Sequence, residues 1–460
     1  MVATANHYLL GAVAVAIPVA VGIRIATWLN DTPGTVVPSS DAFFLHIEGT
    51  GAAQHVGGLV MLEATDDRPS IDDVRALVRD SFARLPRMHQ RLAPTSRWRR
   101  PRWIEAEYVD LDWHVTELQS VDGKTGLMRI LGELAESPMP RDRPMWQVAI
   151  VRDVGPGGAD ALVVLVHHSI ADGIGTVLQA LSLFEPRATL PVPSGRAPSR
   201  VRRAAAVAVG LAQLATDGTA ASLPESSPQR GFGVANVELE VVRRTAAAHG
   251  VRVTDVVIAL LADAVYAVAP ELARSVDGRM RFSVTTMVRT PDSAAEGNAT
   301  AAVIVDVPVD GRPFGDLLVE VATRTRRLRR PTRAMASRFV MATGLRLVPE
   351  PFARWFAQTV YGPRFLHAVV SNMPGPTIAL TFAGVGTGPT YPILPLVPET
   401  PLAVGALSWD GVLGIGLATD PQLLDSAAVA RHLCATLARL QEGSPVSGSR
   451  PLKGEEEPSA

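Results

Sequence analysis

Strand-like and helix-like patterns alternate along most of the chain. Residues 55–64 (HVGGLVMLEA) have the apolar density of a buried strand, whereas residues 70–85 (SIDDVRALVRDSFARL) have a serine cap, early acids and apolar residues at helical spacing. Further strand-like runs occupy residues 281–288, 301–309 and 367–375, and helix-like runs occupy residues 253–269 and 425–440. This alternation predicts an α/β fold.

Composition divides the chain into two halves. Residues 38–184 and 233–443 carry the alternating pattern, while residues 185–232 between them are rich in proline, serine, glycine and arginine, which is typical of a linker. An alanine-rich stretch inside this linker, residues 202–215, predicts a helix. Residues 444–460 are polar, so we expect a disordered tail there.

The first 30 residues have a different character. Residues 1–23 carry no formal charge apart from His7 when it is protonated. Their length is near the ~20 residues that a membrane span requires. No basic region precedes the apolar run, so a cleaved secretory signal is not expected. Three interpretations stay open, namely a membrane anchor, a helix buried on the body, and an extension from an upstream start codon. If the segment spans, Arg24 favours a cytoplasmic body.

Charge and cysteine content narrow the classes of partner and cofactor. The 44 basic and 45 acidic residues leave a net charge of −1, so no global field attracts nucleic acid. With one cysteine, Cys434, the chain cannot form an internal disulfide or a cysteine-rich metal cluster. We predict that Cys434 is a packed helix residue, and we expect neither a metal nor a redox cofactor.

The strongest candidate for chemistry follows a buried strand. The run ALVVLVHHSIADGIGTVLQAL ends its strand at His167 and His168, before a turn and a helix. A strand end gives a side chain rigid support and can open into a cleft. His168 suits proton transfer near neutral pH, because the reference pKa of histidine is ~6.5. The turn could bring Asp172, which precedes Gly173, back towards the strand end to fix the loop or an arginine.

Two other interpretations of the histidine pair stay open at this point. Two satisfied core histidines would give the same pattern, and a histidine four residues before an aspartate also arises by chance. A metal site is less favoured, because adjacent residues of a strand point to opposite faces and one ion would not easily bind both.

The segment HHSIADG resembles the HHxxxDG signature of the CoA-dependent acyltransferase superfamily. The rest of the chain resembles the bacterial wax ester synthase/diacylglycerol acyltransferase branch of that superfamily. The segments that carry this resemblance, in chain order, are SSDAFFLHIE, HVGG, RPMWQVAI, VTDVVIALLADAV, GNATAAVIVDVPV, VVSNMPGP and LSWDGVLGIGLATD. Together they cover roughly residues 38–440.

The resemblance implies a fold and a reaction. The fold would consist of two chloramphenicol-acetyltransferase-like domains, with mixed sheets flanked by helices and an active-site channel between them. His168 would take a proton from an acceptor hydroxyl, whose oxygen would attack the thioester of a long-chain acyl-CoA. The acceptor would be diacylglycerol or a long-chain alcohol, and His167 would shape the site or support His168. Acyl-CoA is a substrate in this scheme, so no cofactor is implied.

Further residues are expected around this site. Asp172 should pair with an arginine, for which Arg289 is the candidate. The residues expected to contact substrate are Asn298, Ser371, Asn372 and Trp146. The segment SNMPGP also fits a simple bend, so turn chemistry is an equal alternative for two of them. The chain departs from the family pattern at Thr254, where the family shows asparagine, and at Met145, where it shows leucine.

Two segments bear on how lipid reaches the enzyme. The run RTRRLRRPTR could bind CoA phosphates or acidic headgroups, or could be a solvated helix face; its arginines include Arg324, Arg326, Arg327, Arg329 and Arg330. The following segment could face a membrane or pack in a core through Phe339, Leu345, Leu347, Phe352, Trp355 and Phe356. We expect association with a membrane or a lipid droplet on the cytoplasmic side.

Two alternative functions share these features. Condensation domains of peptide synthetases and polyketide-associated acyltransferases carry a similar HHxxxDG signature but accept acyl groups from carrier proteins. The segments SNMPGP, RPMWQVAI and LSWDG favour the lipid branch. A non-catalytic lipid-binding paralogue is suggested by Thr254 and by the apolar amino-terminal segment, whereas the intact His168, Asp172 and Gly173 argue against it.

Overall fold

The computed structural model describes residues 33–190, 200–215, 218–287, 295–326 and 331–442. The predicted apolar segment 1–30 and the polar tail 444–460 lie outside these ranges. No helix in the described ranges is long and apolar enough to cross a membrane. The described residues also contain no cluster of histidine, cysteine, aspartate and glutamate arranged to hold a metal ion.

The amino-terminal half is built on a mixed sheet with the strand order β5-β6-β7-β2-β14-β13-β8. The pair β5 and β6 is parallel, and the other neighbours are antiparallel. The strand bounds are β2 His55–Leu62, β5 Val115–Gln119, β6 Trp146–Arg152, β7 Ala161–His167, β8 Phe184–Glu185, β13 Thr381–Phe382 and β14 Val385–Ile393. Two strands from late in the sequence therefore complete the sheet of the first half.

Helices and a small three-stranded sheet surround this layer. The helices are α2 Ser39–Glu48, α3 Ile71–Phe82, α4 Leu111–His114, α5 Gly123–Glu136 and α6 Gly173–Ala180, with 3₁₀ turns η1 Pro86–His89, η2 Pro156–Gly158 and η3 Leu181–Leu183. The small sheet contains β1 Thr35–Val36, β3 Gln90–Leu92 and β4 Arg102–Glu105. Ser70 caps α3 as predicted, since its side chain accepts a hydrogen bond from the Asp73 backbone N–H.

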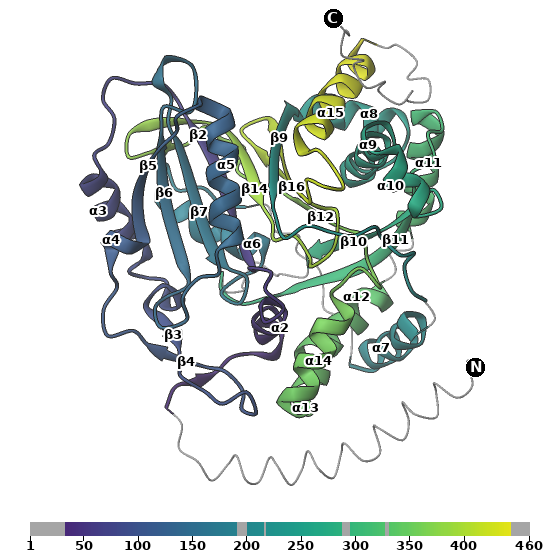
Figure 1. The fold of residues 1–460 in the computed structure, drawn as a ribbon, viewed down its shortest axis with the longest axis horizontal. Coiled ribbons are helices and arrows are strands. Elements are labelled where there is room, and N and C mark those ends of the chain that lie inside the picture. Colours follow the sequence, from purple (N-terminus) through teal and green to yellow (C-terminus); the bar gives the residue numbers. More distant parts are fainter. Residues whose placement is uncertain (1–32, 191–199, 216–217, 288–294, 327–330, 443–460) are drawn as a thin grey trace, which may run out of the picture.

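The carboxy-terminal half has a second mixed sheet, in the order β11-β10-β12-β15-β16-β9. Its strands are β9 Gly231–Glu238, β10 Arg279–Met287, β11 Thr300–Pro308, β12 Ala368–Met373, β15 Leu402–Trp409 and β16 Val412–Thr419. One face is covered by α8 Leu239–Ala248, α9 Val253–Val268, α10 Pro270–Ser275, α11 Phe314–Thr325 and α15 Ser426–Gln441 (Figure 1). Helix α9 is buried along nearly its whole length, which explains its almost unbroken apolar sequence.

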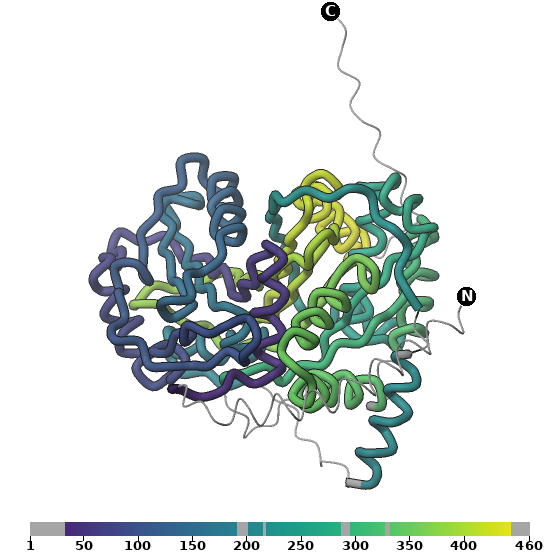
Figure 2. Tube along the Cα trace, turned by 60° about the horizontal axis from the view of Figure 1, so that its bottom comes forward, coloured from purple at the N-terminus to yellow at the C-terminus, as the bar shows by residue number. Residues whose placement is uncertain are grey.

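A second group of helices lies on the opposite side of this sheet (Figure 1). It contains α7 Arg200–Ala215, α12 Pro331–Phe339, the π-helical turn η5 Val340–Gly344, α13 Leu345–Leu347 and α14 Glu350–Val360. Helix α7 falls where the alanine-rich stretch of the linker predicted one. In Figure 2 the two halves form separate lobes, and the purple segment that contains α2 lies between them.

Strand β14 joins the two halves. It pairs with β2 in the first sheet while packing against β16 of the second. A Cβ atom on Gly414 would lie 1.9 Å from the carbonyl oxygen of Thr390, and one on Gly416 would lie 1.9 Å from that of Pro392. Glycine at both positions therefore allows the close approach of the two strands.

The α/β fold predicted from the alternating pattern is confirmed, but one local prediction is wrong. Cys434 lies on α15 as expected, yet its side chain is exposed rather than packed. The face of α15 that turns to the core carries Leu433 and Leu437, and Cys434 follows Leu433 by one residue, which rotates it away from that face.

Candidate active site

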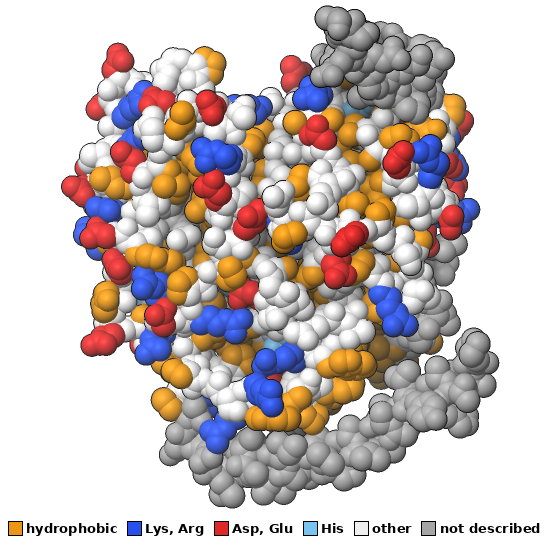
Figure 3. All heavy atoms as spheres, viewed as in Figure 1, with side chains coloured by type: hydrophobic (Ala, Val, Ile, Leu, Met, Phe, Trp, Pro, Cys, Tyr) orange, Lys and Arg blue, Asp and Glu red, His pale blue; other side chains and the backbone are white. Residues whose placement is uncertain are grey.

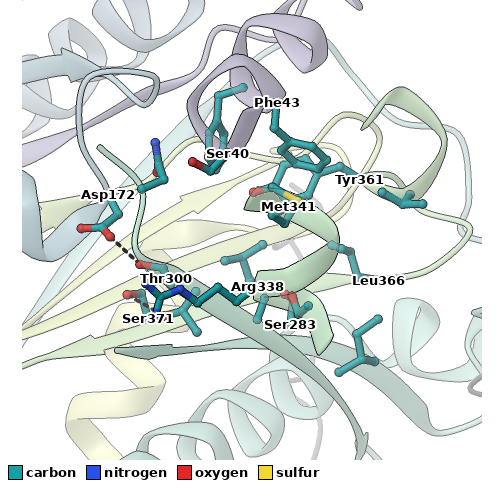
Figure 4. A pocket seen from close by; sticks show the side chains of 18 of the residues that line it. Ser40, Phe43, Asp172, Ser283, Thr300, Arg338, Met341, Tyr361, Leu366 and Ser371 are labelled. Carbon is teal, nitrogen blue, oxygen red and sulfur yellow. Dashed lines mark hydrogen bonds between the residues drawn. The ribbon is translucent and has the colours of Figure 1, made fainter. Parts of the chain in front are cut away.

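A cavity of about 600 Å³ lies at the junction of the two halves, and its wall is mostly apolar. The predicted site residues on this wall are His168, Asp172 and Gly173 from the first half and Asn298, Ser371 and Asn372 from the second. Figure 4 shows Asp172, Thr300 and Ser371 on one side of the cavity and Met341, Tyr361 and Leu366 on the other. The fold thus brings segments far apart in sequence to one place.

His168 follows directly on the end of β7. Its backbone N–H donates to the carbonyl of Gln54 at 2.7 Å, which ties the turn to the segment before β2. The imidazole stacks on the ring of Phe44, with 3.7 Å between the ring centroids and an angle of 5° between the planes. Nδ1 is buried, so Nε2 is the nitrogen open to the cavity.

The surroundings of His168 favour its neutral form. Burial, with a smaller contribution from nearby His167, lowers the pKa of this imidazole to about 4, although the residue's own carbonyl, Asp172 and Asn298 oppose the change. A neutral imidazole can accept a proton, whereas an imidazolium cannot. At neutral pH His168 is therefore in the protonation state that a general base needs.

His167 has a closed environment by comparison. Its side chain is fully buried, and Nδ1 accepts a hydrogen bond from the Ser169 N–H at 3.0 Å and contacts Ser169 Oγ at 2.7 Å. An accepting Nδ1 places the ring proton on Nε2, which lies 3.4 Å from Glu48 Oε1. His167 does not line the cavity, so the structure gives it a supporting position.

Glu48, at the end of α2, is held as a carboxylate in this buried cluster. Burial alone would raise the pKa of Glu48, but the neighbouring His167 and Arg141 outweigh it and lower the pKa to about 2. Arg141 contacts Glu48 Oε2 at 2.9 Å. This carboxylate favours the tautomer of His167 that carries its proton on Nε2.

Asp172 connects the two halves rather than transferring protons. Its Oδ1 accepts from the N–H of Gly175, which caps α6 at 2.8 Å. Its Oδ2 accepts from the Ala299 N–H and from the Thr300 hydroxyl, each at 2.8 Å (Figure 4). This agrees with the architectural role predicted for the carboxylate. Its predicted partner Arg289 lies outside the described residues, so that pairing stays a prediction.

Asn298 links His168 to a buried aspartate that the sequence analysis did not single out. Its Nδ2 donates to the carbonyl of His168 at 2.8 Å and to Asp41 Oδ1 at 3.0 Å, and its backbone N–H also donates to Asp41 at 2.9 Å. Burial raises the pKa of Asp41, while the bonds from Asn298 oppose that change. Asn298 therefore positions the backbone of the turn that carries His168.

Asn298 sits beside a backbone conformation that favours glycine. Gly297 has a φ of +76°, and a Cβ atom there would meet the carboxylate of Asp41 at 3.5 Å. Its N–H donates to the carbonyl of Ile170 at 2.7 Å, next to an isolated bridge between Gly297 and Ala171. The sequence GN before β11 therefore serves to dock this loop onto the histidine turn.

The predicted pair Ser371 and Asn372 lies at the end of β12. Ser371 Oγ and Thr285 Oγ1 lie 3.0 Å apart in a hydrogen bond, and both residues line the cavity. Asn372 Nδ2 donates to Thr254 Oγ1 at 3.0 Å. The hydroxyl at position 254, where the family pattern has asparagine, is thus an acceptor for a residue of the cavity wall.

Two other predictions need revision. Trp146 does not reach the cavity, because it is buried between Phe82 and His114, and its Nε1 donates to the carbonyl of Met88 at 2.9 Å. Its place on β6 turns it into the core of the first half. Gly173 lines the cavity but has no reactive group. A Cβ atom there would lie 2.7 Å from Met373 Sδ, so this position serves close packing of α6 on the second half.

The arginine-rich run is only partly described. Arg324 contacts Glu320 at 2.6 Å and donates to the carbonyl of Asp306, as in a solvated helix face. Arg326 is exposed, and Arg327, Arg329 and Arg330 lie outside the described residues. Its suggested role in binding phosphates stays a prediction.

Comparison with known proteins agrees with this arrangement. The family model for the wax ester synthase/diacylglycerol acyltransferase catalytic domain matches residues 38–186, and the model for the C-terminal domain of the same family matches residues 296–441. The chain belongs to this family. It is therefore an acyltransferase of the wax ester synthase/diacylglycerol acyltransferase type, as the resemblance of its motifs implied.

Individual relatives are distant in sequence but similar over most of their length. Rv1760 of Mycobacterium tuberculosis, named as a candidate diacylglycerol O-acyltransferase, is 24% identical over 84% of this chain and 85% of its own. Rv0221 of the same species, with a similar name, is 23% identical over 83% of this chain and 90% of its own.

Solved structures share the two-domain fold. The wax ester synthase/diacylglycerol acyltransferase of Marinobacter aquaeolei VT8 aligns with a TM-score of 0.62 at 21% identity, covering 89% of this chain and 99% of that one. The first condensation domain of the CDA synthetase aligns with a TM-score of 0.59 at 18% identity, covering 91% and 98%. At these identities the likeness concerns the fold.

Proposed function

We propose that this member of the family transfers a long acyl chain from acyl-CoA to the hydroxyl group of diacylglycerol, of a long-chain alcohol, or of both. The observation that carries this proposal is the position of His168. A histidine whose pKa is lowered to about 4 presents Nε2 to an apolar cavity of about 600 Å³ between the two halves.

In the proposed reaction Nε2 of His168 takes the proton of the acceptor hydroxyl. The acceptor oxygen forms a bond to the thioester carbonyl carbon, and the carbonyl oxygen becomes a tetrahedral oxyanion. When this intermediate collapses, the carbon–sulfur bond breaks and the imidazolium returns the proton to the departing CoA thiolate. The ester and free CoA are the products, and no acyl-enzyme is formed.

Polar groups on the cavity wall supply donors for this sequence of steps. The hydroxyls of Ser371 and Thr285 are hydrogen-bonded to each other, and when Thr285 is the donor the Ser371 proton can turn to an oxygen in the cavity. A donor aimed at a developing oxyanion lowers the barrier more than one that binds the ground state. We assign this role to Ser371, while Asp41 and Asn298 act as positioning residues for the turn that carries His168.

The apolar character of the cavity supports lipid substrates. Its wall includes Phe43, Ile304, Met341 and Val369. Acyl chains and neutral acceptors can move from water into such a cavity at little cost in solvation free energy. A neutral ester product leaves water readily for the same reason. An acceptor of this kind resides in a membrane or a lipid droplet, so we place the enzyme at that surface, on its cytoplasmic side.

The test is release of free CoA from palmitoyl-CoA by the full chain, with diacylglycerol or hexadecanol as acceptor. We expect acceptor-dependent release that drops by about 100-fold or more in His168→Ala, because the base is removed. His249→Ala is the matched control, since His249 is exposed at the end of α8 and lies off the cavity wall. The control should keep wild-type rates.

Other outcomes would redirect the assignment. Release with a carrier-bound acyl donor but not with acyl-CoA would favour chemistry of the condensation-domain kind. Binding of acyl chains by folded protein without CoA release from either acceptor would favour a lipid-binding role. Full activity in His168→Ala would contradict the general-base assignment.

A further inference from the structure

The helices on the outer side of the cavity form one connected layer. Helix α7 packs tightly on α12, because a Cβ atom on Gly210 would lie 2.1 Å from the carbonyl oxygen of Thr332. Helix α14 contacts α2 where Glu350 Oε1 lies 3.2 Å from His46 Nε2. Gln358 also donates to the carbonyl of His46 at 3.0 Å. The layer of α7, α12, η5, α13 and α14 is thus part of the folded body, and we call it the outer helical layer.

Large apolar side chains on this layer are exposed. Trp355 is 56% exposed and Leu347 is 58% exposed, and Phe339 and Phe352 are each more than one-third exposed. Phe352 and Trp355 lie together, with 5.3 Å between their ring centroids. In Figure 3 the hydrophobic side chains gather at the lower edge of the molecule, where Figure 1 places α13 and α14. Such a group of exposed aromatic and aliphatic side chains marks an interaction surface.

The charge of this layer differs from that of the whole chain. Between residues 331 and 360 the sequence has four arginines, of which Arg338 lies on the cavity wall, and the single acid is Glu350, which is buried beside His46. The sequence of α7 adds three arginines and no acid. The chain as a whole has a net charge of −1. A basic surface with exposed tryptophan, phenylalanine and leucine is complementary to an anionic lipid bilayer.

The same helices line the cavity from within. Phe356 and Val360 of α14 lie on the cavity wall, as do Val340 and Met341 of the π-helical turn η5 and Leu214 of α7. On α14, Phe352 and Trp355 face outward while Phe356 faces the cavity. A lipid acceptor that leaves the bilayer at this surface would therefore have one helix layer to pass before it reaches His168.

We propose that the outer helical layer docks on an anionic bilayer through Leu347, Phe352 and Trp355, with Arg346 and Arg354 at the headgroups, and that the lipid acceptor enters the cavity between these helices. This proposal rests on the proposed function in assuming that the acceptor is a membrane lipid. It adds which surface of the protein meets the membrane.

The test places an environment-sensitive fluorophore at Leu347. Because Cys434 is the only cysteine, Cys434→Ser with Leu347→Cys allows labelling at one position of the full chain. With vesicles of phosphatidylcholine and phosphatidylglycerol we expect the emission at position 347 to rise and shift to shorter wavelength. The matched control carries the label at Val121, which is 79% exposed in the other half before α5, and should not respond. The probe reports its own surroundings, so lipid binding elsewhere in the chain gives no signal at position 347.

The charge contribution is tested separately. Arg346→Gln with Arg354→Gln should weaken binding to the anionic vesicles by about 30-fold, since each arginine near such a surface contributes about fivefold. Vesicles of phosphatidylcholine alone should show little difference between wild type and variant. Equal binding of wild type and variant to the anionic vesicles would overturn the charge argument.

Failure of this proposal can be separated from failure of the proposed function. The fluorescence measurement contains no substrate, so it succeeds or fails independently of catalysis. Protein that binds vesicles while the label at position 347 stays unchanged would overturn the docking surface, even if CoA release continues. Conversely, a response at position 347 in a protein that never releases CoA would leave the docking surface standing and remove the proposed reaction.

Discussion

The two adjacent histidines occupy opposite environments. His167 is fully buried, with Nδ1 occupied by Ser169 and Nε2 directed at the Glu48 carboxylate. His168 has one face against Phe44, buries its Nδ1 and opens to the cavity. One ring is therefore fixed by its neighbours, and the other keeps a nitrogen available for substrate. The same residue type can thus have a closed, supporting place and a place open to the cavity at consecutive positions.

The different roles of the two histidines predict the largest effects when each is replaced with glutamine. His168→Gln should lose at least 100-fold in the rate of CoA release and change the free energy of unfolding by less than about 1 kcal/mol, because few contacts depend on this ring. His167→Gln should instead lose about 2 kcal/mol of stability, since it disturbs a buried network. Rates come from thiol release and stabilities from urea unfolding followed by circular dichroism. A reversed pattern would mean that the roles are exchanged.

The turn that carries His168 provides the next largest expected effect. Asp172→Ala removes a buried acceptor of three hydrogen bonds, from Gly175, Ala299 and Thr300, and should cost about 3 kcal/mol of unfolding free energy. Asp425→Ala is the control, because Asp425 caps α15 by bonds to Ala427 and Ala428 but is exposed. It should cost only about 1 kcal/mol. Equal losses in the two variants would show that Asp172 acts as a helix cap and not as a link between halves.

Some of this arrangement could be predicted from sequence. The site at the end of β7 was predictable because a buried apolar run ends on a histidine pair with an aspartate one turn later. The contribution of α2 was not, because Asp41 meets Asn298 across 257 residues of chain and no local pattern reports that contact. The segment SSDAFFLHIE carries part of the family resemblance. Its local pattern does not reveal that Phe44 stacks on His168 or that the carboxylate of Glu48 lies beside His167.

Strand β14 and Trp146 show two further limits of local patterns. The sequence of β14, VGTGPTYPI, has two glycines and two prolines, which predict turns rather than a strand that crosses to the other sheet. Trp146 stands in a segment shared with the family, but that fact does not say which face of β6 it occupies. Both outcomes depend on tertiary packing, which local propensity does not determine.

The smallest expected effect is the change of kcat/KM with pH. It distinguishes His168, with its lowered pKa, from a histidine with the reference pKa. With a pKa of about 4, His168 remains mostly neutral at pH 5, so kcat/KM should fall by less than about twofold between pH 7 and pH 5. A histidine with the reference pKa of ~6.5 would lose about 25-fold over the same range. The profile should decline only as pH approaches about 4. An inflection near pH 6.5 would contradict the lowered pKa.

Loss of the folded state at low pH sets the lowest pH at which these rates can be measured. Burial lowers the pKa values of His55 and His114 to about 4 as well. Because the unfolded chain binds these protons near pH ~6.5, the stability that the neutral histidines contribute is present above that pH and is lost as pH falls towards 4. Circular dichroism at each pH must therefore accompany the rates, with His168→Gln measured alongside as the background. A decline in kcat/KM that follows the loss of folded signal reports unfolding, whereas a decline in folded protein reports protonation of the base.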